Sequence, residues 1–127
     1  MIGYVTIGAL DSAASGTFYD AMLGAIGYER AFADGGWIGY QVKGAATPTV
    51  YLCPPFDGKP ASFGNGSMVA FKTDSQAAVQ AAYEAGLAAG GTDEGKPGFR
   101  PPEKQGWYGA YLRDPTGNKL AVYCTPA

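Results

Sequence analysis

Two short runs of the chain read alike: Tyr4-Val5-Thr6-Ile7 and, 64 residues later, Met68-Val69-Ala70-Phe71. Both are rich in the β-branched and apolar residues that favour strands. Further matches follow in the same order, and the offset has grown to 70 where Trp37 matches Trp107. An ordered series of matches whose offset grows slowly is typical of a duplicated unit that has gained residues in its loops. The sequence therefore predicts two copies of one structural module.

The two copies, about residues 1–60 and 65–127, are predicted to contain the same elements in the same order. In the first copy, Phe18, Met22 and Ile26 recur at four-residue spacing in an Ala-rich stretch, which indicates one apolar face of a helix. The expected helices span residues 12–25 and 75–89, and the expected strands span residues 4–7, 28–32, 37–42, 49–53, 68–72, 92–95, 107–113 and 119–124. The predicted fold class is α+β, with two tandem β-α-β-β-β modules that form a single domain over residues 1–127.

The composition argues against several classes of function. The chain has a net charge of −2 and nine scattered Lys and Arg residues, so nucleic acid is not an expected partner. No apolar run approaches the length of about 20 residues that a membrane span needs, so no membrane partner is expected. There is no histidine, which removes the commonest metal ligand and the commonest general base. The two cysteines, Cys53 and Cys124, match under the repeat and are interpreted as buried, unreactive thiols in a cytoplasmic protein.

The acidic side chains near predicted element ends are interpreted as structural, and no catalytic residue is assigned. Asp11 or Ser12 is expected to cap the first predicted helix and Asp74 or Ser75 the second, with the two aspartates preferred. Asp114 opens the sequence Asp-Pro-Thr-Gly-Asn, which specifies a tight turn by restricting the backbone.

Several motifs of the chain resemble those of one protein superfamily. The closing motif runs from Tyr111 to Leu120 and contains Asp-Pro-Thr-Gly-Asn before the last predicted strand. The opening run Met1–Gly8, the triplet Phe18-Tyr19-Asp20 and the stretch Leu23–Tyr28 add to the likeness. Together with the two modules, these motifs resemble the vicinal oxygen chelate superfamily, which includes glyoxalases, extradiol dioxygenases and bleomycin-resistance proteins. The segment Pro54–Ala61 is similar to a glyoxalase-like bacterial subgroup.

The resemblance implies positions for a metal site, and the residues there do not suit a metal. Metal-using members take His, Glu or Gln ligands from the first and last strand of each module. Here those positions hold Tyr4 and Met68 on the first strands, and Val50 (with a register uncertainty of one residue) and Ala121 on the last strands. Tyrosine is a poor ligand unless it is ionised, methionine is a weak, soft ligand, and valine and alanine have no donor atom. The expectation is therefore no bound metal and no other cofactor.

A pocket is still expected, because the superfamily's sheets curve around a cavity. The predicted ligand-binding residues are Tyr4, Trp37, Tyr51, Met68, Arg100, Trp107 and Ala121. Arg100 lies in a Pro-rich segment, and a guanidinium group can hold a carboxylate or phosphate through two hydrogen bonds. We expect it to hold the anionic or polar end of a ligand whose apolar body lies near Tyr4 and Met68. The alternative is that this segment is only an exposed connection.

The functional hypothesis is metal-independent binding of a small, partly apolar molecule by a homodimer, as in the drug-sequestering branch of the superfamily. The alternative is a glyoxalase-like lyase or isomerase that uses Glu103 or Tyr4 as a base, or a metal held by unexpected ligands. Whether the chain is an enzyme stays open between these two. A third class is a structural relic that works through its partners, and likeness of fold does not choose among the three.

Overall fold

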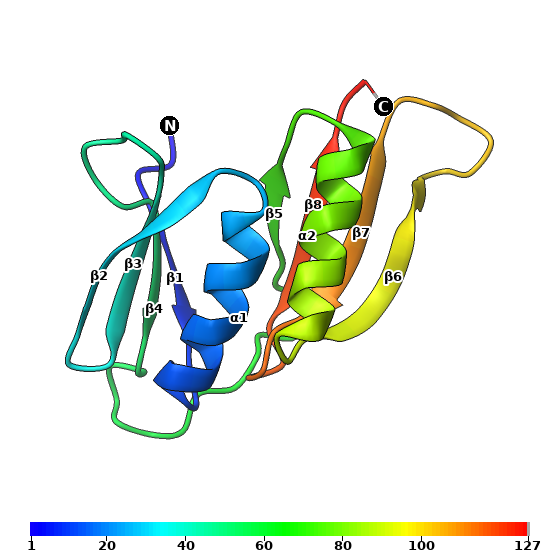
Figure 1. Ribbon diagram of the computed structural model, residues 1–127. Coiled ribbons are helices and arrows are strands. Elements are labelled where there is room, and N and C mark those ends of the chain that lie inside the picture. Colours follow the sequence, from blue (N-terminus) through cyan, green and yellow to red (C-terminus); the bar gives the residue numbers. More distant parts are fainter. Residues whose placement is uncertain (127) are drawn as a thin grey trace.

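The structure, a computed structural model, describes residues 1–126. In these residues the elements follow the order β1 (Val5–Gly8), α1 (Ser12–Gly24), β2 (Tyr28–Asp34), β3 (Trp37–Val42), β4 (Val50–Cys53), β5 (Val69–Lys72), α2 (Gln76–Ala88), β6 (Thr92–Phe99), β7 (Tyr108–Arg113) and β8 (Lys119–Cys124). Each half of the chain therefore has the order β-α-β-β-β, as predicted (Figure 1). The main difference is β6, which continues through Phe99, beyond the end of the strand expected over residues 92–95.

The strands form two four-stranded sheets, one from each half of the chain. The first sheet has the strand order β1-β4-β3-β2 and the second has the order β5-β8-β7-β6. Each sheet is mixed, because β1 runs parallel to β4 and β5 runs parallel to β8, whereas the other neighbours are antiparallel. The two tandem modules are thus confirmed. The sheets do not close around a cavity, because β1 and β5 are both edge strands and are not hydrogen-bonded to each other.

Both helices begin where the sequence predicted, at side chains that accept hydrogen bonds from the first turn. Asp11 Oδ1 accepts from the backbone N–H of Ala14 at 3.1 Å, and Ser75 Oγ accepts from that of Ala78 at 3.1 Å. The preference for Asp74 as the cap of α2 is therefore wrong, and the alternative, Ser75, is the cap. Each such cap stabilises its helix by about 1 kcal/mol.

Neither α1 nor α2, the helices of the described residues, combines the length and apolar character needed to cross a membrane.

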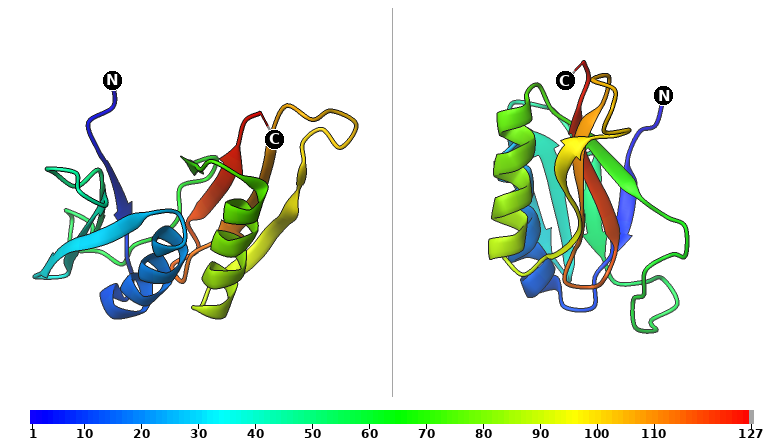
Figure 2. Two further views of the ribbon diagram at one scale, coloured as in Figure 1. Left: turned by 45° about the horizontal axis from the view of Figure 1, so that its top comes forward. Right: turned by 90° about the vertical axis from the view of Figure 1, so that its right-hand side faces the viewer.

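The helices pack against each other and cover the same side of both sheets (Figures 1 and 2). Phe18, Tyr19, Met22 and Leu23 of α1 are fully buried in this layer. The strands contribute Ile7, Ile38, Tyr40, Val50 and Leu52 from the first sheet and Phe71, Tyr108, Ala110, Leu112, Leu120, Val122 and Cys124 from the second. The side of each sheet that faces away from the helices has no such layer over it.

Candidate functional site

The uncovered sheet sides can be assigned residue by residue, because side chains alternate between the two faces of a strand. We call them the open faces. The residues that alternate with the core residues Ile7, Ile38 and Leu52 form the open face of module one. This face carries Tyr4, Thr6, Gly8, Glu29, Phe32, Asp34, Trp37, Gly39, Gln41, Tyr51 and Cys53. Neighbours of Phe71, Leu112 and Val122 form the open face of module two, which carries Ala70, Lys72, Gly109, Tyr111, Arg113, Lys119, Ala121 and Tyr123.

An aromatic cluster centred on Tyr51 occupies the open face of module one. The centroid of the Tyr51 ring lies 5.3 Å from that of Tyr4 and 6.1 Å from those of Phe32 and Trp37. Tyr4 is 63% exposed and Trp37 is 40% exposed, so the cluster presents aromatic surface to solvent. Three predicted binding residues, Tyr4, Trp37 and Tyr51, therefore lie together. Phe32 joins them, although its position in the second strand gave no reason to select it.

A cavity of about 520 Å³ adjoins this cluster, lined by Thr6, Gly8, Trp37, Cys53, Pro54, Pro55 and Phe56. Its lining is mainly apolar, as is usual for small-molecule sites. Burial raises the pKa of the Cys53 thiol. The thiol is therefore protonated and a poor nucleophile at neutral pH. This cavity is suited to holding an apolar group and not to covalent chemistry at Cys53.

A second cavity, of about 220 Å³, lies where β1 approaches β5 and the start of β8, and its lining includes Thr6, Ser62, Ser67, Met68, Asn118 and Lys119. Met68 is 45% exposed. Thr6 and Gly8 line this cavity as well as the one beside Trp37. Strand β1 therefore borders both cavities. Met68 lines the cavity of about 220 Å³, and Trp37 lines the cavity of about 520 Å³.

Three stacked rings occupy the open face of module two. Trp107 folds back over Gly109, and its ring lies 5.8 Å from that of Tyr111 and 5.4 Å from that of Tyr123, with interplanar angles of 23° and 13°. We call Tyr111, Trp107 and Tyr123 the aromatic ladder. The Arg100 guanidinium lies 5.6 Å from the centroid of the Tyr111 ring, and the Lys119 ammonium lies 5.1 Å from it.

The remaining predicted binding residues lie in module two and not beside Tyr4. Ala121 pairs with Tyr111 and with Ala70 and is fully buried. Arg100 follows β6, the outer strand of the second sheet, whereas Met68 precedes β5 at the opposite edge. At a strand spacing of about 4.8 Å, these two strands are about 14 Å apart. Within one chain, the structure therefore brings Arg100 to the aromatic ladder and not to Tyr4 and Met68.

Asp114 joins the two modules. It is 4% exposed, and its Oδ1 accepts hydrogen bonds from the backbone N–H groups of residues 116–118, each at 2.9 Å. Its Oδ2 accepts from the Tyr19 hydroxyl of α1 at 2.7 Å and from the Asn118 amide at 2.9 Å. The same amide donates to the Gly8 carbonyl of β1 at 2.9 Å. The predicted turn is confirmed, and the contacts to module one are an addition that local sequence did not reveal.

The Asp114 carboxylate also affects the tyrosine that it binds. Burial, with the neighbouring Asp114 charge, raises the pKa of Tyr19 well above its ordinary value. The hydroxyl therefore stays protonated and continues to donate its hydrogen bond at neutral pH. This tyrosine lies in the core, so we assign it a structural role.

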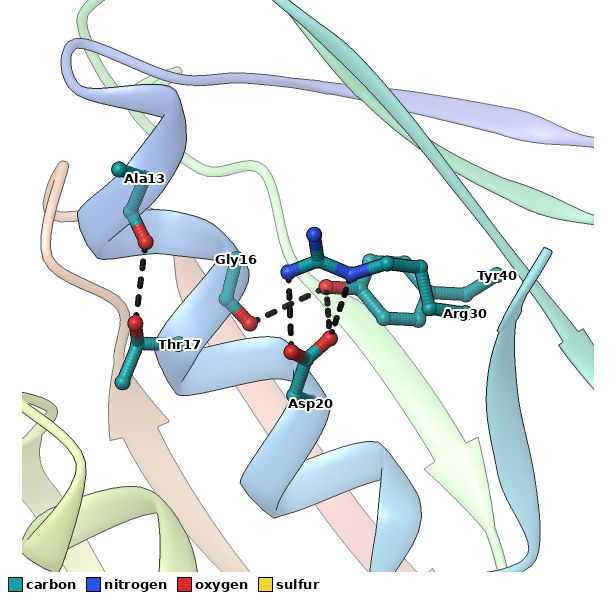
Figure 3. A network of polar contacts seen from close by, with 6 residues as sticks. All are labelled: Ala13, Gly16, Thr17, Asp20, Arg30 and Tyr40. Atoms are coloured by element: carbon teal, nitrogen blue, oxygen red, sulfur yellow. Dashed lines mark hydrogen bonds and ion pairs between the residues drawn. The ribbon is translucent and has the colours of Figure 1, made fainter. Parts of the chain in front are cut away.

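Asp20, the last residue of the triplet Phe18-Tyr19-Asp20, is the centre of a second network, which holds α1 to the first sheet (Figure 3). Its carboxylate accepts from Arg30 Nε at 3.0 Å, from Arg30 Nη2 at 2.9 Å and from the Tyr40 hydroxyl at 2.8 Å. The Tyr40 hydroxyl also lies 3.2 Å from the Gly16 carbonyl, and a Cβ at Gly16 would lie 2.6 Å from Arg30 Nη2. This network lies on the helix side and takes no part in either open face.

The family of the chain follows from its similarity to a solved structure. The chain is 38% identical to a glyoxalase/bleomycin resistance protein from Albidiferax ferrireducens T118, with a TM-score of 0.86 and coverage of 98% of each chain. The chain belongs to the glyoxalase/bleomycin resistance protein family. Two more distant structures share the fold. A glyoxalase-related enzyme from Fulvimarina pelagi is 22% identical, with a TM-score of 0.77 and coverage of 99% of this chain and 88% of that one. A lactoylglutathione lyase from Agrobacterium tumefaciens is 20% identical, with a TM-score of 0.67 and coverage of 98% of this chain and 92% of that one. No family model matches the chain, and no curated protein matches its sequence.

The positions that the resemblance assigns to metal ligands lie in or directly before β1, β4, β5 and β8. Val50 is buried toward the helices, so Tyr51 is the last-strand residue of module one that reaches the open face. Tyr4 and Tyr51 then offer two phenols, Met68 a thioether and Ala121 no donor atom. Among residues 1–126, no three His, Cys, Asp or Glu side chains gather closely enough to hold a metal ion. This donor set does not fit a divalent metal.

The expected equivalence of Cys53 and Cys124 is wrong. Gly8, the last residue of β1, pairs with Cys53, and Lys72, the last residue of β5, pairs with Tyr123. Cys53 therefore corresponds to Tyr123, and Cys124 lies one residue further along, on the opposite face. Accordingly, Cys53 lines a cavity on the open face, whereas Cys124 belongs to the core. Both thiols are buried and free, as expected.

Proposed function

We propose that this glyoxalase/bleomycin resistance protein has a degenerate metal site and binds a small, partly apolar molecule without a metal. The observation that carries the proposal is the combination of an unsuitable donor set at Tyr4, Tyr51, Met68 and Ala121 with aromatic open faces. Concave, mainly apolar surfaces with few polar groups are typical of small-molecule sites. Burial of apolar ligand surface there supplies about 25 cal/mol per Å².

The proposed site uses the residues that the sequence singled out, in two groups. Tyr4, Trp37 and Tyr51 supply aromatic contact on module one, next to the cavity of about 520 Å³. Trp107 and Arg100 supply contact and charge on module two, over the buried Ala121. Met68 lines the cavity between the modules.

We also propose that the protein is a cytoplasmic homodimer. Large apolar side chains remain exposed on the open face of the first sheet and beside its edge, including Tyr4, Trp37 and Met68. A second copy that faced these residues would remove apolar surface from water and enclose a ligand more completely. Sedimentation at micromolar concentration tests this part, and a mass equal to one chain would overturn it.

The binding proposal is tested by metal analysis and ligand screening on one preparation. Protein purified without chelators is expected to contain far less than one equivalent of zinc, nickel, iron or manganese. Thermal stabilisation by aromatic and aliphatic small molecules is expected to be the same with and without EDTA. Near-stoichiometric metal that is lost in a Tyr4→Phe, Met68→Leu double variant would overturn the proposal.

The enzymatic alternative would show itself as turnover that depends on a residue of this chain. Its candidate bases are Glu103, which lies exposed in the segment after β6, and Tyr4, whose ring packs on Tyr51. Neither residue adjoins a second group that would activate it as a base among the hydrogen bonds of residues 1–126. Binding is therefore the better-supported function.

A further inference from the structure

The two open faces differ in charge. Arg30 is the one Lys or Arg within strands β1–β4, and it lies on the helix side, paired with Asp20 at 2.9 Å. The open face of module two carries Lys72, Arg113 and Lys119, and Arg100 stands beside it over the Tyr111 ring. Since the whole chain has a net charge of −2, this concentration of cations is local.

Within the described residues, one of these cations is neutralised by an ion pair. Arg113 Nε lies 3.0 Å from Glu94 Oε1. Arg100 and Lys119 form no ion pair with another residue in 1–126 and instead lie over the Tyr111 ring. Lys119 and Arg113 are direct cross-strand partners, an arrangement that is unfavourable for like charges. A bound anion would relieve this repulsion.

The same place offers contact surface and further hydrogen-bond donors. The aromatic ladder is half-buried, and its Tyr111 ring lies within reach of the Arg100 and Lys119 side chains. Lys119 also lines the cavity between the modules, together with Ser62 and Ser67. Serine hydroxyls can donate to a carboxylate or phosphate oxygen. A ring system and an anionic group are therefore both accommodated within one small region.

We propose that the open face of module two binds a planar aromatic anion. The ring packs against the aromatic ladder, the carboxylate or phosphate group pairs with Lys119, and Arg100 adds positive charge from the other side of the site. This inference rests on the proposed function and narrows it to one class of ligand and one module. It also assigns a role to Lys119, which the sequence motifs did not single out.

The test uses 2-naphthoate and 2-naphthyl phosphate as anionic probes, with 2-naphthamide as the neutral match and 2-naphthylmethylammonium as the cationic match. The two indole N–H signals in an NMR spectrum of the full chain report on Trp37 and Trp107, and a Trp37→Phe variant assigns them. Both anionic probes are expected to shift the Trp107 signal and to bind at least about tenfold more tightly than the amide. The relative affinity of the two anions distinguishes a carboxylate from a phosphate ligand.

Charge variants sharpen the test. Lys119→Met is expected to weaken 2-naphthoate binding about tenfold and Arg100→Gln about threefold. The control is Lys43→Met, which removes the same charge from an exposed site after β3 and is expected to leave the affinity unchanged. An unchanged amide spectrum and melting temperature show that each variant is folded.

The outcomes separate this inference from the proposed function. If 2-naphthamide binds as tightly as 2-naphthoate, or if the Trp37 signal moves and the Trp107 signal does not, the anion site is wrong while small-molecule binding stands. If Lys43→Met weakens binding as much as Lys119→Met, only the net charge matters and the site is again wrong. If no probe moves either signal and the ligand screen also finds no stabilising molecule, both proposals fail.

Discussion

In module one, three aromatic rings surround Tyr51, and the open face has no Lys or Arg. In module two, three stacked rings lie among four cations. The helix sides of the two sheets do not diverge in this way, since both contribute to one buried apolar layer and both helices begin at a capping side chain. Packing constrains the residues beneath the helices, because a cavity or an unpaired charge there is costly. The open faces carry no such constraint, so duplicated modules can acquire different chemistry there.

The contact that joins the modules is expected to give the largest effect. Asp114→Ala would leave a turn, Tyr19 and Asn118 without their acceptor, so we expect a loss of about 3–4 kcal/mol in the free energy of unfolding. Asp20→Ala is the matched control in module one, where the carboxylate is 47% exposed, and it is expected to cost about 1 kcal/mol. Urea unfolding monitored by circular dichroism measures both. Equal losses would show that the two networks contribute alike.

Replacing the glycines under the aromatic rings with alanine should cost different amounts of stability on the two open faces. A Cβ at Gly109 would lie 2.7 Å from Trp107 Cζ3 and 2.8 Å from the Val122 carbonyl oxygen, which is backbone and cannot move aside. A Cβ at Gly39 meets the Phe32 and Pro48 side chains instead. We expect Gly109→Ala to cost about 2–3 kcal/mol and to change Trp107 fluorescence, and Gly39→Ala to cost about 1 kcal/mol. A greater cost at Gly39 would contradict the stacked arrangement over Gly109.

Alkaline pH should weaken the contact between the modules through Tyr19. The pKa of this tyrosine is raised in the folded state, so its contribution is fully present below about pH 10 and is lost as the pH rises toward the folded-state pKa. In that range the free energy of unfolding is expected to fall by up to about 1.4 kcal/mol per pH unit for this group. Tyr19→Phe should flatten the dependence, as seen in urea unfolding between pH 9 and pH 11. An identical slope in the variant would assign the loss to other groups.

The smallest effect concerns the two thiols. Burial raises the pKa of both Cys53 and Cys124, so both should react slowly with an aromatic disulfide reagent at pH 7.5. Cys53, which lines a cavity and is 8% exposed, should still react before Cys124, which is 2% exposed in the core. Mass spectrometry of Cys53→Ser and Cys124→Ser variants gives the order. Faster modification of Cys124 would contradict the assignment of the two faces.

The elements and their order could be predicted from local sequence, because each depends on neighbouring residues. The spacing of Phe18, Met22 and Ile26 indicated α1, and the Asp-Pro-Thr-Gly-Asn run indicated the turn before β8. Alternation along a strand also places Trp107, Gly109 and Tyr111 on one side of β7, and the stacking of Trp107 on Tyr111 agrees with it. The family also followed from such motifs, as the 38% identical structure confirms.

Only the tertiary structure decided which residues meet across the fold. Matching Cys53 to Cys124 required an offset of 71 residues, whereas the strand pairing makes Cys53 equivalent to Tyr123. This shift of one residue moves a side chain to the other face of a sheet. Irregular pairing in β6 between Asp93 and Gly98 likewise left the position of Arg100 undetermined by counting. Residue types and periodicity therefore determined the modules of this protein. Register and bulges decided which side chains reach its open faces, and the contacts of Asp114 decided how the modules are joined, because all of these depend on partners distant in the chain.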